Sequence, residues 1–130
     1  MLLRSILLWL AIIALETLHG IARVALLQPL VGDFRARQLA VFTGSLLILT
    51  VAWFGVRWIR PVRASQALGV GAVWVALTVW FELALGRLVM KLSWERIAED
   101  YDLSRGGLLA LGLLAMFFAP WFAARRQRLI

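Results

Sequence analysis

Hydrophobic residues fill four long runs of the chain, and short polar stretches separate these runs. The runs cover about residues 6–30, 39–58, 67–90 and 108–124. A helix of about 20 mostly apolar residues crosses a hydrocarbon core about 30 Å thick, so each run can span a bilayer. Backbone groups in lipid must be satisfied within the segment, and the runs lack the alternation of barrel strands. The pattern predicts an all-α integral membrane protein with four transmembrane helices in one domain, residues 1–130.

The composition supports this prediction and excludes several other classes of protein. The chain is 63% hydrophobic and 16% charged, with a mean hydropathy of +0.89. Ordinary soluble domains are about 45–50% apolar and about 25% charged. A water-soluble fold, a disordered segment and a nucleic-acid-binding domain are therefore excluded. The chain has no cysteine and a single histidine, so we expect no disulfide, no metal site and no cofactor.

The distribution of basic residues predicts the orientation of the four spans. One side of the predicted bundle carries seven basic residues and no acid, whereas the other carries five basic and five acidic residues. The positive-inside rule then places both termini in the cytoplasm and the protein in the inner (plasma) membrane. We expect the basic side to meet anionic lipid headgroups, with no nucleic-acid partner. The seven are Arg4, Arg57, Arg60, Arg63, Arg125, Arg126 and Arg128, and the five are Arg35, Arg37, Lys91, Arg96 and Arg105.

Five ionisable residues interrupt the first and third runs and are the candidate ligand- or proton-binding residues. Glu16, His19 and Arg23 are spaced i, i+3 and i+7, so they share one face of the first helix. Glu82 and Arg87 lie in the third. A charge at mid-bilayer costs on the order of 2.5–3.5 kcal/mol, so such residues normally face a bundle interior and are paired. We expect Glu16 to pair with Arg87 and Glu82 with Arg23, or the pairs to form within each helix.

The first and third runs also share a short motif. Glu16 and Gly20 in the first run match Glu82 and Gly86 in the third, and an arginine follows each pair. Two spans in each unit would relate the halves by an axis along the membrane normal. The match covers a handful of positions, so a tandem repeat of two helical hairpins and a chance similarity between apolar hairpins are both open.

The polar connections on the side opposite the termini hold secondary candidates. Large side chains recur at helical spacing in residues 93–101, which predicts an amphipathic helix lying on the membrane surface. Asp102 follows it, and Asp33 begins the matching short loop, residues 33–37. These acids could bind a cation or line the mouth of a cavity, or form a solvated acidic loop. Arg35 or Arg37 can pair with them.

Two functional hypotheses follow from these residues. In the first, the protein is an oligomeric transporter or channel-like protein for a proton, an ion or a small polar ligand. Glu16 and Glu82 would carry protons or contact the ligand, while Arg23 and Arg87 would hold an anionic group with help from His19. In the alternative, it is a non-catalytic accessory or assembly subunit whose buried ion pairs are structural. Four spans shield a central polar site poorly, so we expect a homo-oligomer or a membrane-protein partner. Small residues at four-residue spacing allow helices to meet closely, either within the chain or between subunits. No catalytic triad or nucleotide loop is apparent, so an enzyme is the third choice.

Overall fold

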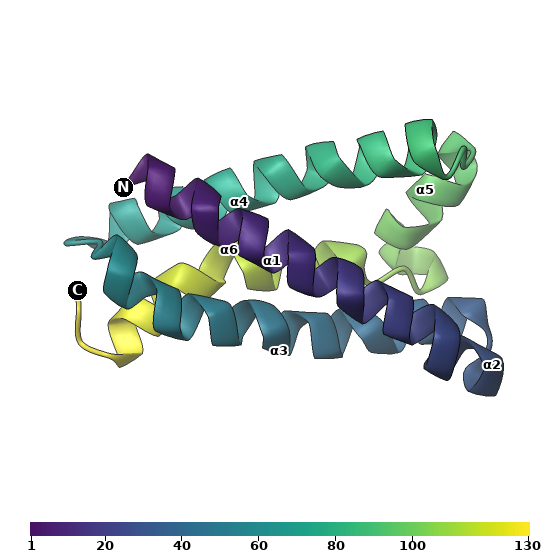
Figure 1. Ribbon diagram of the computed structural model, residues 1–130, viewed down its shortest axis with the longest axis horizontal. Coiled ribbons are helices and arrows are strands. Elements are labelled where there is room, and N and C mark those ends of the chain that lie inside the picture. The colour runs from purple at the N-terminus through teal and green to yellow at the C-terminus, as the bar shows by residue number, and fades with distance from the viewer.

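The computed structural model describes the backbone of residues 1–130 and all side chains except that of Arg105, one of the basic residues counted above. The described chain is helical and contains no strand (Figure 1). Two of the short elements, η1 and η2, are π-helical, and η3 is a 3₁₀ turn. In chain order the elements are α1 (Leu2–Ala22), η1 (Arg23–Leu27), α2 (Gln28–Val31), α3 (Asp33–Ile59), α4 (Ala64–Ala84), η2 (Leu85–Val89), α5 (Trp94–Tyr101), η3 (Leu103–Arg105) and α6 (Leu109–Arg126).

Four continuous helical stretches are long and apolar enough to cross a membrane, which confirms the all-helical expectation. These stretches are Leu2–Val31, Asp33–Ile59, Ala64–Val89 and Leu109–Arg126. The first and third are composite, because α1 runs through η1 into α2 and α4 runs into η2.

The second stretch begins earlier than predicted, so the placement of Asp33 in a loop was wrong. Gly32 alone makes the turn, at a φ of 89° that favours glycine. Asp33 follows as the first residue of α3, where a negative charge is favourable at the helix N-terminus. Its carboxylate also accepts a hydrogen bond from Arg37 Nε, one turn later, at 3.0 Å. These two features extend the helix through the expected loop.

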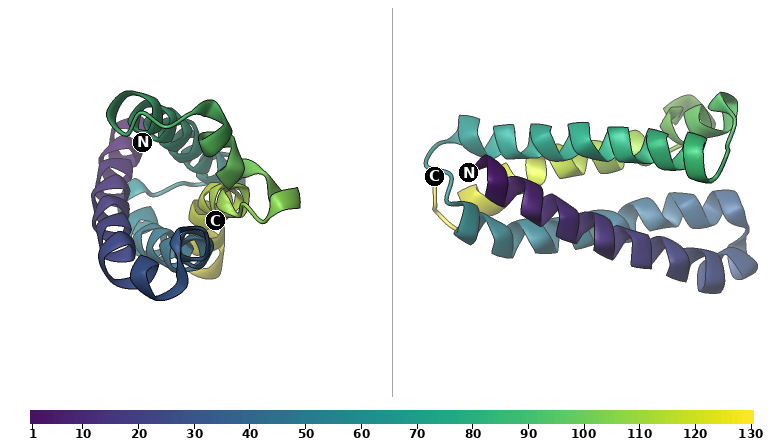
Figure 2. Two further views of the ribbon diagram at one scale, coloured as in Figure 1. Left: turned by 90° about the vertical axis from the view of Figure 1, so that its right-hand side faces the viewer. Right: turned by 45° about the horizontal axis from the view of Figure 1, so that its top comes forward.

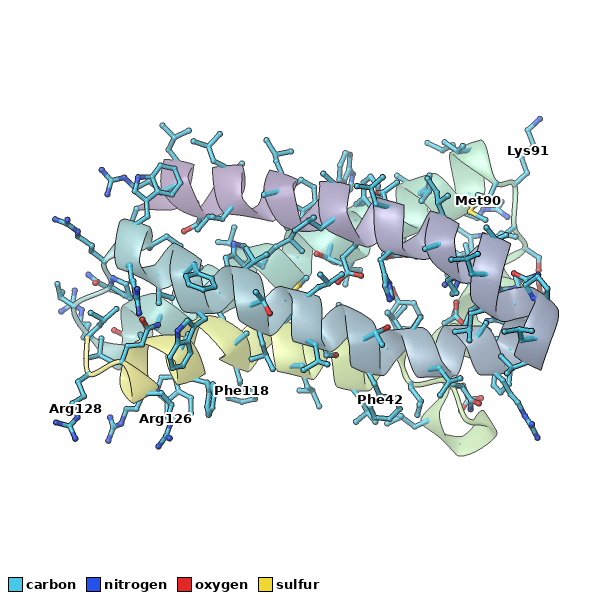
Figure 3. The ribbon with its side chains drawn as sticks, turned by 60° about the horizontal axis from the view of Figure 1, so that its bottom comes forward. Phe42, Met90, Lys91, Phe118, Arg126 and Arg128 are labelled. Atoms are coloured by element: carbon cyan, nitrogen blue, oxygen red, sulfur yellow. The ribbon has the colours of Figure 1, made fainter. Side chains whose placement is uncertain are left out.

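Both chain termini and the α3–α4 connection lie at one end of the bundle, which we call the terminal end (Figure 1). The turn at Gly32 and helix α5 lie at the opposite end, the loop end. Figure 3 shows Arg126 and Arg128 at the terminal end and Met90 and Lys91 at the loop end. The seven arginines of the side without acidic residues therefore lie at the terminal end, in the helix ends and in the α3–α4 connection.

The half of the bundle near the terminal end, the terminal half, is tightly packed. Helix α6 packs against α3 and α4, while α1 packs across both. Trp9, Trp74 and Val56 are buried in its core. At Gly71 the backbones of α4 and α6 touch, because a Cβ atom there would lie 1.9 Å from the carbonyl oxygen of Phe117. Small residues therefore set the helix spacing in this half.

The helices separate toward the loop end. Helix α1 crosses the bundle diagonally, so it begins beside α4 and ends beside the start of α3 (Figures 1 and 2). Helix α5 crosses the loop end between α4 and α6 (Figure 2). In the half near the loop end, the loop half, the helix backbones therefore lie farther apart than in the terminal half (Figure 1).

Candidate functional site

A cavity of about 640 Å³ lies in the loop half, among α1, η1, α3, α4, η2, α5 and α6. Six charged side chains line it, three acidic and three basic, so their formal charges sum to zero. They come from four of the helices and from η1, because the diverging helices and the crossing α5 bring distant segments together. The six are Glu16, Arg23, Arg37, Glu82, Arg96 and Asp100.

Four of the five candidate residues line this cavity, and the fifth does not. Glu16, His19, Arg23 and Glu82 belong to the lining. Arg87 is exposed instead: its Cζ lies 4.7 Å from the ring centroid of Trp94, and its Nη1 donates to the carbonyl oxygen of Leu92 at 2.9 Å. Five helical positions separate Arg87 from Glu82, which turns it about 140° away. Arg87 holds the α4–α5 connection rather than the cavity.

The carboxylate of Glu16 packs against the bare backbone of α3. A Cβ atom at Gly44 would lie 2.9 Å from Glu16 Oε2 and 3.2 Å from Oε1, so the absence of a side chain at Gly44 leaves room for the carboxylate in this position. His19 Nδ1 lies 3.8 Å from Oε2. The other oxygen, Oε1, is buried and has no hydrogen-bond partner among the described atoms.

His19 lies between Glu16 and a hydroxyl that sequence reasoning missed. His19 Nε2 lies 2.6 Å from Thr43 Oγ1, and this hydroxyl lies 3.3 Å from the carbonyl oxygen of Ala40. If the hydroxyl donates to Ala40, His19 donates through Nε2 and turns the Nδ1 lone pair toward Glu16. The only sequence signal for Thr43 is its position just before Gly44 in an apolar run.

The expected ion pairs do not form. Of the described side chains, no arginine lies within ion-pair distance of Glu16 or Glu82. Arg87 is directed to Trp94, and the separation of α1 from α4 leaves Arg23 apart from Glu82. Arg23 Nε is buried without a partner. The prediction that these charges pair with one another was therefore wrong.

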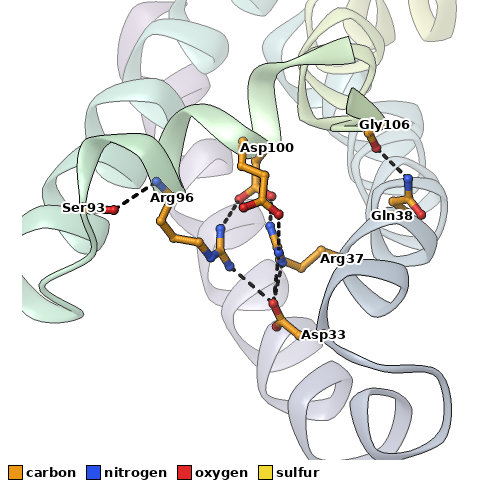
Figure 4. Close-up of polar contacts among 8 residues, drawn as sticks. Asp33, Arg37, Gln38, Ser93, Arg96, Asp100 and Gly106 are labelled. Atoms are coloured by element: carbon orange, nitrogen blue, oxygen red, sulfur yellow. Dashed lines mark hydrogen bonds and ion pairs between the residues drawn. The ribbon is translucent and has the colours of Figure 1, made fainter. Parts of the chain in front are cut away.

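A separate network of paired charges closes the loop end of the cavity (Figure 4). Arg37 in α3 donates to Asp33 Oδ2, to Glu99 Oε1 at 3.1 Å and to Asp100 Oδ1. Arg96 donates to Asp100 Oδ2 at 3.2 Å and lies 3.7 Å from Asp33 Oδ2. We call these residues the Arg37 network. Of the two arginines proposed as partners for the outer acids, Arg37 makes these pairs.

The Arg37 network joins α5 to the start of α3. The Arg37 side chain is only 10% exposed, whereas its acidic partners are 28–48% exposed. Gln38 Nε2 adds a hydrogen bond of 2.7 Å to the carbonyl oxygen of Gly106 (Figure 4). Asp102 lies outside the cavity lining and caps η3, accepting from Ser104 N at 3.1 Å.

Helix α5 turns part of its apolar face inward. Ile97 is buried against Gly86, where a Cβ atom would lie 3.1 Å from Ile97 Cδ1. Tyr101 lines the cavity, and its hydroxyl is buried without a partner. Burial raises the pKa of Tyr101, and the negative charges of Glu82 and Asp100 raise it further, so the phenol keeps its proton. The expectation that this face lies on the membrane surface was wrong for these two side chains.

The side chains that line the cavity can donate and accept hydrogen bonds, but they are not placed to bind a metal ion. Among the described residues, no group of three or more His, Cys, Asp or Glu side chains is placed to hold a metal ion. No family model, curated protein or solved structure matches the chain.

Proposed function

We propose that the protein is a four-span membrane carrier that binds a small polar ligand in the cavity of its loop half. One observation carries this proposal. Glu16 Oε1, Arg23 Nε and Tyr101 Oη are buried, lack partners and line the same cavity from three different elements. A buried polar atom without a partner costs about 1–3 kcal/mol. A ligand toward which these three side chains rotate, and which then satisfies all three atoms, would recover that free energy on binding.

The outer surface of the bundle supports a location in the membrane. Large apolar side chains are exposed along every long helix, including Leu26 at 70%, Leu46 at 64%, Leu88 at 76% and Leu114 at 54%. Water-soluble monomers rarely expose apolar area on this scale, whereas lipid solvates it. Under the positive-inside rule the basic terminal end faces the cytoplasm of the inner membrane, so the cavity lies in the outer half.

The packing of the terminal half favours a carrier over a channel. Trp9, Trp74 and Met116 fill the centre of the bundle between the cavity and the terminal end. A cavity that reaches halfway and is closed by packed side chains has the form of a binding site accessible from one side. The accessory-subunit alternative needs charges locked in pairs, and Glu16, Glu82 and Arg23 are not so locked.

Labelling of single introduced cysteines tests this proposal, because the chain has no cysteine of its own. Ser45 lines the cavity, whereas Thr50 on the same helix is exposed on the outside of the bundle. Each hydroxyl donates to the carbonyl oxygen four residues earlier, so the two sites are matched. We expect methyl methanethiosulfonate, which is small, uncharged and membrane-permeant, to modify Ser45→Cys in membranes and to leave Thr50→Cys unmodified, because a thiol in a polar hydrated cavity ionises whereas a thiol in lipid does not.

The other results are equally informative. If neither cysteine reacts, the cavity is dry and the accessory-subunit alternative takes its place. If both react at similar rates, α3 is surrounded by water and the membrane location is wrong.

A further inference from the structure

The exposed apolar side chains of the cavity lining lie along the flank of the bundle and reach the loop end at Met90. They include Ile21, Val24 and Met90, which are 62%, 50% and 57% exposed. Ile21 and Val24 lie at the α1–η1 junction, and Met90 follows η2, so the mouth lies between the ends of the first and third helical stretches. Val24 is seven residues before Val31, which puts it about 10 Å from the loop end. In the proposed orientation this apolar mouth faces the outer leaflet.

The two π-helical turns flank this mouth. The N–H of Gln28 bonds to the carbonyl oxygen of Arg23, and that of Met90 bonds to the carbonyl oxygen of Leu85, each five residues back. Single π-turns within α-helices often mark functional sites, because they widen the helix locally. Beside the mouth, Gly20 lines the cavity and has no heavy atom within 4 Å of the position of a Cβ. The flank thus has room for a chain to pass.

The interior of the cavity is complementary to a zwitterionic group, which carries one positive and one negative charge. Glu16 and Glu82 make no pair with an arginine among the described side chains and can accept hydrogen bonds from a cation. Arg23 Nε and the Tyr101 hydroxyl are unpartnered donors for an anion. Arg37 and Arg96 are already engaged with acids. A volume of about 640 Å³ lies in the usual range for a small-molecule site.

We infer that the ligand is a zwitterionic amphiphile that enters sideways from the outer leaflet. Its ammonium group lies between Glu16 and Glu82, its phosphate accepts from Arg23 and Tyr101, and its acyl chains leave between η1 and η2. This inference rests on the proposed function and names the ligand class. A water-soluble zwitterion would need the polar interior but not the apolar mouth, whereas a lipid uses both.

The carboxylates also predict which ammonium group binds. A primary ammonium offers N–H donors to Glu16 and Glu82, whereas a trimethylammonium offers none. Charge-assisted hydrogen bonds are about twice as strong as neutral ones, so this difference is large enough to measure. We expect phosphatidylethanolamine to bind at least about tenfold more tightly than phosphatidylcholine, which corresponds to about 1.4 kcal/mol.

The test is a titration of the purified protein in maltoside detergent, followed by thermal unfolding. The probes are phosphatidylethanolamine, phosphatidylcholine, phosphatidylglycerol and the water-soluble headgroup glycerophosphoethanolamine. We expect the first to raise the unfolding temperature at the lowest concentration and the soluble headgroup to have no effect at the same concentration. Equal shifts with all three lipids would show non-specific lipid contact and overturn the inference.

Two matched variants locate the binding. A tryptophan at Val24 would fill the mouth, whereas Leu26→Trp, on η1 but outside the cavity lining, changes only the outer surface. We expect Val24→Trp to weaken phosphatidylethanolamine binding by at least about tenfold and Leu26→Trp to leave it unchanged. If the two weaken binding equally, the mouth is not the route.

The outcomes separate this inference from the proposed function. Binding of glycerophosphoethanolamine as tightly as of the lipid would support a polar ligand but overturn the lateral route. Failure of every probe to bind, with Ser45→Cys still modified, would leave a hydrated site for another ligand and overturn only the zwitterionic amphiphile. If Ser45→Cys is unreactive as well, both proposals fail.

Discussion

The two halves of the bundle treat their buried polar groups differently, although the same four helical stretches build both. In the terminal half every buried polar side chain that the structure describes has a partner. Trp9 Nε1 donates to Thr78 Oγ1 at 2.9 Å, and Trp74 Nε1 donates to the carbonyl oxygen of Ser5 at 2.9 Å. At the boundary with the cavity, which Thr78 and Met116 also line, Thr78 donates to Met116 Sδ at 3.3 Å. In the loop half three buried polar atoms lack partners. The unsatisfied atoms are therefore a property of the cavity and not of the whole fold.

The close approaches of the helices differ in the same way. Gly71 in the terminal half meets the backbone of Phe117, which cannot move without shifting α6. Gly44 in the loop half meets the carboxylate of Glu16, which can rotate away. A backbone contact thus fixes the spacing of α4 and α6 at Gly71, whereas a side chain that can move fills the space at Gly44. A rigid half beside an adaptable one suits a protein that holds a ligand in a defined scaffold.

The largest loss of stability is expected at Gly71, where the backbones of α4 and α6 touch. A Cβ atom at Gly71 would lie 1.9 Å from the Phe117 carbonyl oxygen, so Gly71→Ala forces α4 and α6 apart. We expect a loss of about 3 kcal/mol in the free energy of unfolding in detergent, at the upper end of overpacking costs. Gly69→Ala is the control, because no atom lies within 4 Å of its Cβ position. A stable Gly71→Ala variant would show that the terminal half is loosely packed.

A smaller loss of stability is expected when the Arg37 network is disrupted. Arg37→Gln removes the charge that holds Asp33, Glu99 and Asp100 together across α3 and α5. The acids keep partial access to solvent, so we expect a loss of about 2–3 kcal/mol rather than the full cost of a buried unpaired charge. Arg35→Gln, an exposed position two residues earlier, should change stability by less than about 0.5 kcal/mol. Equal losses of stability in Arg37→Gln and Arg35→Gln would show that the network does not stabilise the fold.

The sequence was sufficient for the helices and for the cavity-lining positions of four of the five candidate residues, but not for the outward position of Arg87. Runs of about 20 apolar residues can satisfy their backbone only as helices if they lie in lipid, so length and hydropathy predict the four stretches. The cost of exposing a charge to lipid then favours an inward position for Glu16, His19, Arg23 and Glu82. Glu16 and Glu82 could therefore be chosen as candidates without any information on the neighbouring helices.

The pairing of charges could not be predicted in this way. Spacing along one helix fixes the face on which Glu16 or Arg23 lies, but not its distance from a residue on another helix. That distance depends on how far α1 diverges from α4, which the packing of the terminal half determines. The contribution of Tyr101 depends on α5 folding back across the loop end, and the turn at Gly32 determines where Asp33 begins α3. These are tertiary features that local periodicity does not encode.

The smallest effects give the sharpest comparison, because two neighbouring positions on α4 should respond differently. Thr78→Val leaves Trp9 Nε1 buried without an acceptor, so we expect a loss of about 1–2 kcal/mol. Glu82→Gln, one turn later, removes a carboxylate that has no arginine partner within ion-pair distance among the described side chains. Its stability should stay within about 0.5 kcal/mol of the parent or rise, as is common when a functional charge is removed.

Chemical unfolding of the purified variants in detergent, with the parent measured in parallel, decides between the two readings of Glu82. A loss of about 3–5 kcal/mol on Glu82→Gln would mean that the carboxylate holds a buried cation in place, as in the accessory-subunit alternative. Unchanged or greater stability, together with loss of phosphatidylethanolamine binding, would mean that the charge is kept for its ligand. Thr78→Val should then still bind the lipid, because its hydroxyl is already engaged by Trp9 and Met116.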